Sequence, residues 1–312
     1  MNNETDLKAR AMKKILITGG SGTIGKACIP FFLGAGYEVD NFDKLKGDDI
    51  FDQDLLSERM RGCDAVLHLA AIPHPCLSGV SDDDYWRVNL EGTKNVFRAC
   101  ESSGVKRLVY LSTGCVYGFW GGYCRPDKFP ISEDNYKPSL SEGLTVYGAT
   151  KLAAEEFLQT VSSSDGVTTV ALRTEGPGAG GTRLEWINGH QNLEYRATSA
   201  TSPAYHFFAR ISKENLFQAL ELSVNVNLKS AYDVFNIGNE YIHWSIDVQK
   251  WLRLHWPNVP NETKGNEALF GINKAKKILG YQPYPVDDHF LNRDAIENYY
   301  YSEAYFGKLG KP

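Results

Sequence analysis

Residues 14–25 read KILITGGSGTIG, an apolar segment that runs into a turn rich in glycine. The apolar part contains several β-branched residues, so it predicts a short buried strand. A helical pattern follows from Thr23 and stops at Gly34 and Gly36. A strand, a glycine turn and a helix in this order are typical of a βαβ unit, in which helices connect parallel strands.

The alternation of strand and helix continues through the first half of the chain. Further strands are expected at residues 37–42, 64–71, 106–113 and 167–173, and further helices at 54–62, 83–104 and 145–164. These strands are almost wholly apolar, as in a parallel sheet that is covered on both faces. We therefore predict an α/β fold, a doubly wound parallel sheet over residues 13–175, after a flexible tail at residues 1–12.

The pattern is looser after residue 175. Helices are expected at 212–223 and near 245–256 and 273–280, with one strand at 232–238. We predict that residues 176–312 form a smaller C-terminal substrate-binding lobe that shares strands with the main sheet.

Composition excludes several classes of protein. Of 312 residues, 42% are hydrophobic and 23% are charged, and the net charge is −5, as in a soluble globular protein that binds no nucleic acid. No apolar run approaches the roughly 20 residues of a membrane span, and the N-terminus lacks a signal-peptide pattern. The six cysteines form no C-x-x-C pair and no zinc-ligand spacing. We expect a cytoplasmic protein without a metal.

The glycine turn indicates a dinucleotide. Gly19, Gly22 and Gly25 would let the backbone approach a pyrophosphate at the N-terminus of the helix. Asp43, at the end of the second strand, could accept hydrogen bonds from both ribose hydroxyls and repel a 2′-phosphate, which favours NAD over NADP. The alternatives are a plain strand-to-helix turn and a solvated carboxylate. The further cofactor contacts that we predict in this region are Thr23, Ile24, Asp49 and Ile50. Asp49 and Ile50 lie in a loop where an adenine edge could be bound, and they could equally be ordinary loop residues.

Tyr147 and Lys151 stand four residues apart in the helix expected at 145–164, so they share one face of it. A free tyrosine has a pKa of about 10. A neighbouring ammonium and a cationic nicotinamide ring would both lower the pKa of Tyr147 and make it a base. Ser112 and Thr113 end the strand before it and could orient a substrate alcohol. The pair alone could equally be an ordinary helix face, but these neighbours predict a proton-transfer site.

Eight motifs occur in a fixed order over most of residues 13–283: TGGSGTIG, DAVLHLAA, RVNLEGTKNV, KRLVYLSTGCVYG, YGATKLAAEE, LRTEGPG, VFNIGN and KKILGYQP. Together they resemble the extended short-chain dehydrogenase/reductase superfamily, and within it the NAD-dependent sugar epimerase/dehydratase family. The resemblance implies a Rossmann fold and NAD as the cofactor.

The resemblance also implies roles for particular residues. Tyr147 would be the general base and acid, and Lys151 would lower its pKa and hold the ribose of NAD. Thr113 would be the third catalytic residue, with Ser112 as a neighbouring support.

Other positions that match the family's motifs lie beside the cofactor. Asn89 would help to organise the site, or would equally well be a buried amide that satisfies a backbone group. His68 is interpreted as a core histidine. The cofactor contacts implied at the end of the strand at 64–71 are Leu69, Ala70 and Ala71.

The implied chemistry removes a hydride from a sugar carbon to NAD while Tyr147 takes the hydroxyl proton. Dehydratases of the family carry Asp-Glu directly after the catalytic threonine, and Gly114 and Cys115 stand there instead. Sugar or nucleotide-sugar 4-epimerisation through a transient keto-sugar is therefore preferred. The family's diphosphate-gripping arginine has no clear match among Arg183, Arg196 and Arg210. An NAD-dependent sugar or sugar-acid dehydrogenase or reductase is the alternative, and a non-catalytic NAD sensor is a more distant one.

The family also implies a homodimer built from two long helices of each protomer. The helices expected at 81–103 and 145–164 are the candidates, with Val96 and Leu152 among the apolar positions available for burial.

Overall fold

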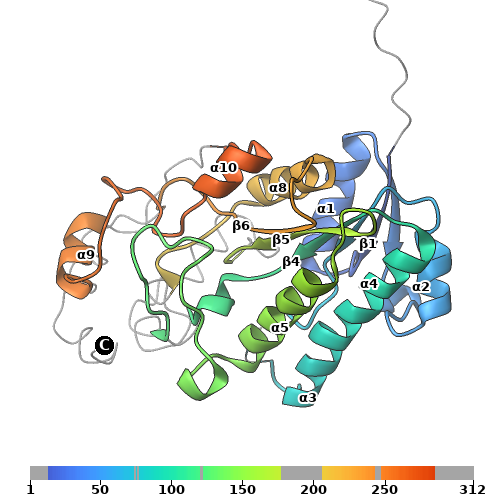
Figure 1. Ribbon diagram of the computed structural model, residues 1–312, viewed down its shortest axis with the longest axis horizontal. Helices are drawn as coiled ribbons and strands as arrows, with labels where there is room; N and C mark the ends of the chain where they lie inside the picture. The colour runs from blue at the N-terminus through green and yellow to red at the C-terminus, as the bar shows by residue number, and fades with distance from the viewer. Residues whose placement is uncertain are drawn as a thin grey trace, which may run out of the picture.

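Six parallel strands form one sheet in the order β2-β1-β3-β4-β5-β6 (Figure 1). The computed structural model describes residues 13–73, 75, 77–119, 122–176, 206–242 and 247–284. Every strand expected from the sequence is present and pairs in parallel with its neighbours. The strands are β1 (Lys14–Thr18), β2 (Glu38–Phe42), β3 (Ala65–His68), β4 (Arg107–Leu111), β5 (Thr168–Arg173) and β6 (Tyr232–Asn236).

Helices cover both faces of this sheet (Figure 1). One face is covered by α1 (Thr23–Gly34), α8 (Lys213–Asn225) and α10 (Asn273–Leu279). The other is covered by α2 (Gln53–Met60), α4 (Gly92–Ser103) and α5 (Val146–Val161). The sheet is therefore doubly wound, as expected. Across the described residues, no helix combines the length and the apolar character that a membrane span requires.

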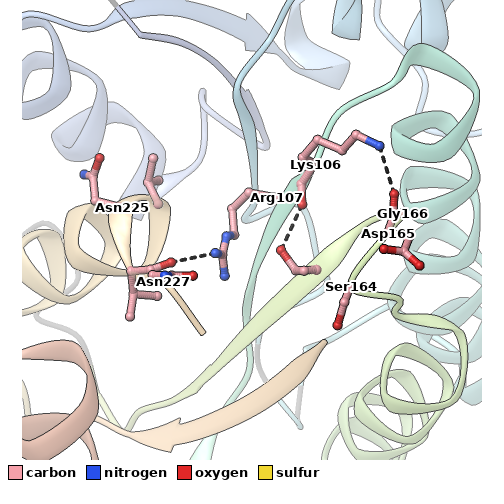
Figure 2. A pocket seen from close by; sticks show the side chains of 10 residues that line it. Lys106, Arg107, Ser164, Asp165, Gly166, Asn225 and Asn227 are labelled. Atoms are coloured by element: carbon pink, nitrogen blue, oxygen red, sulfur yellow. Dashed lines mark hydrogen bonds between the residues drawn. The ribbon is translucent and has the colours of Figure 1, made fainter. Parts of the chain in front are cut away.

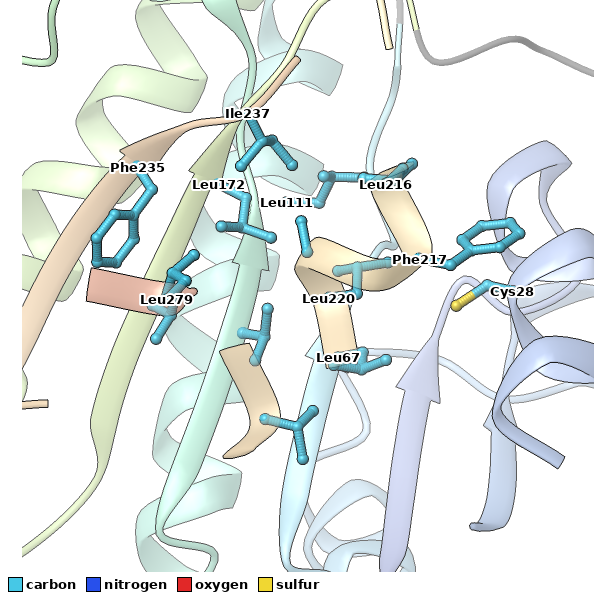
Figure 3. Packing of buried hydrophobic residues seen from close by; sticks show 14 of the residues in the cluster. Cys28, Leu67, Leu111, Leu172, Leu216, Phe217, Leu220, Phe235, Ile237 and Leu279 are labelled. Atoms are coloured by element: carbon cyan, nitrogen blue, oxygen red, sulfur yellow. The ribbon is translucent and has the colours of Figure 1, made fainter. Parts of the chain in front are cut away.

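The first face is held by strand residues that point at α8. Figure 3 shows Leu67, Leu111 and Leu172 of the sheet beneath Leu216 and Leu220 of that helix. All five side chains are buried, and burying a leucine contributes about 1.5–3 kcal/mol. This face thus joins strands of the first half of the chain to a helix of the second half.

The second face is formed by alternate residues of the same strands. Leu16, Val66 and Leu108 pack there with Val96 of α4 and Leu158 of α5. Because successive side chains of a strand point to opposite faces, two covered faces require strands that are apolar at every position. Val96 is completely buried in this core. It is therefore not available to a dimer interface, which corrects one expectation, whereas Leu152 is only half-buried.

The long helix expected at residues 83–104 has a wide turn in its middle. It begins as α3 (Asp82–Tyr85), continues as the π-helical segment η2 (Trp86–Glu91), and then becomes α4. A capping box at Ser81 opens it, and Gly104, with a φ of 80°, ends it. Single π-helical turns of this kind are frequent at functional sites.

An aromatic cluster lies beyond the end of the sheet, beside α9 (Val248–His255). Phe129 is completely buried there, with its ring centroid 5.4 Å from that of Phe207 and 6.3 Å from that of Trp256. The loop that follows Thr113 therefore packs into this aromatic cluster. Its residues form the short 3₁₀ helices η3 (Gly114–Tyr117) and η5 (Leu140–Glu142).

Candidate active site

A cavity of about 980 Å³ opens where the strands end. Gly19 follows β1, Asp43 follows β2, Leu69 follows β3 and Thr113 follows β4, and all four line it. β2 and β3 lie on opposite sides of β1, so the chain changes direction at this point of the sheet. Ligands of open α/β sheets bind at the carboxyl ends of the strands beside such a switch point.

Nearly all the residues predicted for the site meet in this cavity. Asn89 is the exception, because it is buried behind the wall. Its amide accepts a hydrogen bond from the backbone nitrogen of Ile72 (2.8 Å) and donates one to the carbonyl oxygen of Ile72 (3.2 Å). Asn89 thus fixes the loop after β3. The predicted residues that line the cavity are Gly19, Gly22, Thr23, Ile24, Gly25, Asp43, Asp49, Ile50, Leu69, Ala70, Ala71, Ser112, Thr113, Tyr147 and Lys151.

The glycine turn has no room for side chains. A Cβ on Gly19 would lie 2.7 Å from the backbone nitrogen of Ala70, and one on Gly25 would lie 2.5 Å from the carbonyl oxygen of Gly19. Gly19 also has a φ of 73°, which favours glycine. Gly22 precedes α1 and offers no capping side chain, so backbone N–H groups at this helix start can serve a pyrophosphate.

Asp43 is held in the cavity wall at the end of β2. Its carboxylate accepts hydrogen bonds from the backbone nitrogens of Ser21 (2.9 Å) and Leu45 (2.8 Å), one at each oxygen. Each carboxylate oxygen can accept more than one hydrogen bond, so Asp43 can still accept from a ribose. With the glycine turn on one side and this carboxylate on the other, the cavity fits NAD.

Lys151 lies deep in the same cavity and is 3% exposed. Its Nζ donates a hydrogen bond to the carbonyl oxygen of Leu111 (2.7 Å) and lies 4.1 Å from the ring centroid of Tyr110. Burial lowers the pKa of Lys151 to about 7, although the carboxylate of Glu155 acts to raise it. Burial therefore destabilises the charged form of Lys151 relative to its neutral form.

Tyr147 is also buried, and its pKa lies above the ordinary value instead of below it. Burial is the main cause, and Cys115 and Glu175 add to it, while a hydrogen bond with Thr113 acts in the opposite direction. The expected lowering by Lys151 is not found in the protein alone, because the Nζ of Lys151 donates to Leu111 and burial dominates.

Ser112 is tied to the body of the protein. Its hydroxyl donates to Glu155, which also receives Nη2 (2.6 Å) and Nε (3.1 Å) of Arg173. Glu155 and Arg173 are both buried. This ion pair joins α5 to β5 beneath the cavity, and Ser112 extends it to the end of β4.

Thr113 contacts a carboxylate that sequence reasoning missed. Its hydroxyl donates to Oε1 of Glu175 (3.2 Å), and Oε2 of Glu175 lies 2.7 Å from Nδ1 of His206. Both residues are buried and line the cavity. Glu175 stands two residues after the end of β5, as Thr113 stands two residues after the end of β4, so its place at a parallel strand end was a usable signal. His206 follows a stretch of sequence without clear hydrophobic periodicity and carried no such signal.

His68 lies inside the sheet, as interpreted from the sequence. Its two ring nitrogens contact the hydroxyls of Thr18 (2.7 Å) and Thr93 (3.0 Å). Burial, together with the charge of Lys151, lowers its pKa to about 3. His68 is therefore a neutral core residue.

A second, shallower pocket of about 370 Å³ lies at the opposite edge of the sheet, where β4 and β5 begin (Figure 2). Lys106 donates to the carbonyl oxygen of Asp165 (3.1 Å), and Arg107 donates to that of Val226 (2.7 Å). These cations hold neighbouring segments together, and we assign no ligand to the pocket.

Comparison with known proteins agrees with this architecture. The model of the NAD dependent epimerase/dehydratase family matches residues 15–184. A "3 beta-hydroxysteroid dehydrogenase/Delta 5-->4-isomerase" from Mycobacterium tuberculosis is 30% identical over 283 residues, which cover 85% of this chain and 66% of that protein. A "UDP-glucose 4-epimerase" from Streptomyces lividans is 31% identical over 176 residues, or 51% of this chain and 50% of that protein.

A solved structure shares the fold. The "UDP-glucose 4-epimerase from Brucella ovis in complex with NAD" superposes with a TM-score of 0.61 at 23% identity, covering 88% of this chain and 94% of that one. The chain spans only half to two thirds of the length of the two curated relatives named above. The family match covers more than half of the chain. The chain belongs to the NAD dependent epimerase/dehydratase family, whose cofactor is NAD.

Proposed function

We propose that this protein catalyses the NAD-dependent 4-epimerisation of a sugar or nucleotide sugar, with Tyr147 as base and acid. One observation carries the proposal. Tyr147, Lys151 and Thr113 face the same cavity as Gly19 and Asp43, so a proton-transfer group and a dinucleotide cradle share one space. A protein that only sensed NAD would have no use for the proton-transfer group.

In this proposal each residue has one task. Tyr147 takes the proton of a substrate hydroxyl, Thr113 orients that hydroxyl, and Lys151 holds the ribose of the cofactor. Bound NAD would supply the acceptor and later the donor of a hydride. Burial of Tyr147 keeps water away from the transient keto-sugar, which can then be reduced from its other face.

The similar proteins include both sugar epimerases and a dehydrogenase. Those named UDP-glucose 4-epimerase come from Streptomyces lividans and Azospirillum brasilense, each 31% identical to about half of this chain. A relative that matches 85% of this chain is named as a dehydrogenase and isomerase of hydroxysteroids. These names support an epimerase and a dehydrogenase alike, and the substrates that they name differ.

Arg210 favours a second candidate, an NAD-dependent dehydrogenase of a sugar acid. Arg210 lines the cavity near Glu175. A Cβ on Gly176 would lie 2.6 Å from Nη1 of Arg210, so this glycine makes room for the guanidinium. A guanidinium in a cavity suits a carboxylate as well as a phosphate.

The test begins with the release of the bound cofactor by denaturation and its identification. Fresh enzyme is then incubated with UDP-glucose, UDP-galactose, UDP-glucuronate, free glucuronate, free galacturonate and a 3β-hydroxysteroid. NADH absorbance and product composition are followed together. An epimeric product without net NADH supports the epimerase, and NADH that accumulates on a sugar acid supports the dehydrogenase.

Tyr147→Phe separates catalysis from binding. The variant keeps the ring and removes the hydroxyl, so we expect turnover to fall by at least about 10²-fold while NAD stays bound. Tyr241→Phe is the matched control, because Tyr241 is exposed and lies outside the cavity lining. Unchanged turnover in Tyr147→Phe, or no turnover of any substrate by the native enzyme, would contradict the proposal.

A further inference from the structure

The hydroxyl of Thr113 has a single hydrogen, and a carboxylate already takes it. The Thr113 oxygen lies 3.2 Å from Oε1 of Glu175. An ionised carboxylate only accepts hydrogen bonds, so Thr113 is the donor in this contact. Burial alone would raise the pKa of Glu175, but His206 and Arg210 hold that pKa below its ordinary value, so Glu175 is ionised at neutral pH.

The lone pairs of the Thr113 oxygen decide what else this hydroxyl can bind. A hydroxyl oxygen has two lone pairs. One of them accepts a hydrogen bond from the backbone nitrogen of Cys115 (3.1 Å). The other remains, and Thr113 lines the cavity. Toward a ligand in the cavity, Thr113 is therefore a hydrogen-bond acceptor and not a donor.

Glu175 is held in the position that takes this hydrogen. Its Oε2 lies 2.7 Å from Nδ1 of His206, and its Oε1 also accepts from Sγ of Cys115 (3.5 Å). A Cβ on Gly114 would lie 2.8 Å from Cγ and 2.9 Å from Oε1 of Glu175, so the glycine makes room for the carboxylate. Turning the carboxylate away from Thr113 would break its contacts with His206 and Cys115.

The neighbouring hydroxyl follows the same pattern. Ser112 donates its hydrogen to Glu155, which is itself held by Arg173. Ser112 lines the cavity as well, so its oxygen also presents lone pairs there. Both hydroxyls at the end of β4 thus direct their hydrogens to buried carboxylates.

An acceptor at this place distinguishes the two forms of a substrate. A substrate hydroxyl carries a hydrogen that it can donate to Thr113, whereas a keto oxygen has lone pairs only. Two oxygens that both present lone pairs repel each other. The proposed reaction interconverts a hydroxyl and a keto group at the same carbon. Thr113 can therefore form a hydrogen bond with the alcohol form and cannot form one with the keto form.

We propose that Glu175 is a positioning residue that fixes Thr113 as an acceptor, so that the site binds the alcohol form of the substrate more tightly than its keto form. On the enzyme, the equilibrium between NAD with the alcohol and NADH with the keto-sugar then lies toward the alcohol. The keto-sugar stays scarce, as an epimerase requires if it is not to release this intermediate. The inference rests on the proposed function, because it assigns Glu175 a task within that reaction.

The test measures this equilibrium in Glu175→Met. Met has about the length of Glu but offers Thr113 no strong acceptor, so the Thr113 hydrogen can turn into the cavity and donate to a keto oxygen. Holoenzyme with bound NAD is mixed with a saturating amount of whichever substrate of the panel above is turned over, and NADH absorbance is followed through the first turnover. We expect the ratio of bound NADH to bound NAD to be about tenfold higher than in the native enzyme.

Thr113→Val tests whether the effect passes through Thr113. Val keeps the shape of Thr and removes the hydroxyl, so the hydrogen bond with the alcohol and the repulsion of the keto oxygen both disappear. This variant should also have a raised ratio of NADH to NAD. Adding Glu175→Met to Thr113→Val should then change the ratio no further.

Glu133→Met is the matched control. Glu133 is buried like Glu175, accepts a hydrogen bond from the backbone nitrogen of Asn236 (2.8 Å), and lies outside the cavity lining. Its ratio of NADH to NAD should be that of the native enzyme, and thermal melting should show that each variant folds. If Glu175→Met does not fold, Thr113→Val alone decides, and a native ratio there overturns the inference.

The remaining results separate this inference from the proposed function. A native ratio in a folded Glu175→Met overturns the inference and leaves the proposed function intact. A shift of the same size when Glu175→Met is added to Thr113→Val also overturns it, since Glu175 then acts through the general structure and not through Thr113. If the native enzyme turns over no substrate of the panel, the proposed function fails first and the inference fails with it.

Discussion

At the scale of single residues, the charge of Lys151 links the site to stability. Its pKa is about 7 in the folded protein, against an ordinary value near 10.4 in the unfolded chain. Below about pH 7 both states carry the charge, and folding bears the full cost of burying it. Between about pH 7 and 10 the folded protein loses the proton while the unfolded chain keeps it, so this cost falls by about 1.4 kcal/mol per pH unit.

Lys151→Met removes the charge and keeps most of the side-chain volume. We expect the variant to gain most stability over the native protein near pH 6, and the gain to shrink steadily towards pH 10. Urea denaturation of both proteins across this range measures the difference. Lys26→Met is the control, because Lys26 is exposed. A gain that does not change with pH would show that the ammonium of Lys151 is not destabilised.

We predict that Asp43 governs the choice between NAD and NADP. Its carboxylate lines the cavity at the end of β2, where a 2′-phosphate would meet a negative charge. Asp43→Asn should therefore improve NADP affinity relative to NAD by about tenfold, the equivalent of about 1.4 kcal/mol. Titration calorimetry with both dinucleotides measures the ratio.

Asp54→Asn is the control for that ratio, since Asp54 is exposed on α2 and outside the cavity lining. If the Asp43→Asn protein has the native ratio of NADP to NAD affinity, the carboxylate does not discriminate between the two riboses.

The sequence predicted a side-chain pair within one helix and missed a pair whose members come from two segments. Tyr147 and Lys151 could be paired because i and i+4 always share a helix face. The contact of Glu175 with His206 joins positions 31 apart across a segment without periodicity. The pKa values of the site residues were harder still to predict from the sequence, because a pKa depends on burial, and burial is a property of the whole fold.

At the scale of elements, the two ends of α1 differ in how a glycine affects stability. Gly25 lies against the backbone of Gly19 and Gly20, whereas Gly34 has open space around it. We expect Gly25→Ala to destabilise the protein by about 1–3 kcal/mol through overpacking and to weaken NAD binding. Gly34→Ala should stabilise it by about 0.5–1 kcal/mol and leave binding unchanged.

Thermal denaturation and NAD titration of the two variants check this contrast. The two substitutions are chemically identical and share a helix, so each is the control for the other. Equal effects at both positions would show that the turn can move aside without cost.

At the scale of the whole molecule, homodimerisation stays a prediction. The candidate surface is the outer side of α4 and α5, which lie beside each other. Val96 is completely buried, and the half-buried Leu152 packs partly against the aromatic cluster. Light scattering over a micromolar concentration range should give about twice the 34.8 kDa of one chain. The mass of a single chain throughout that range would contradict the dimer.

The sheet as a whole was predictable because most of its strands are predominantly apolar and are separated by helical patterns. The wide turn η2 was not predictable from the sequence, since over so short a stretch the apolar spacing of a π-helical turn cannot be told from that of an α-helix. The aromatic cluster around Phe129 was not either. It joins residues more than a hundred positions apart, such as Phe129 and Trp251, and no local pattern records such a contact. The boundary predicted at residue 175 stays a prediction.

The position of α8 on the first face has a consequence for synthesis. The ribosome makes the chain from its amino end, so β1, β3, β4 and β5 emerge before residues 213–225 exist. During that interval α2, α4 and α5 can already cover one side of the growing sheet. The other side stays uncovered until α8 is made, because Leu216 and Leu220 of α8 pack there against Leu67, Leu111 and Leu172. An incomplete sheet with one apolar side open attracts other chains, so the nascent protein is most exposed to aggregation midway through its own translation.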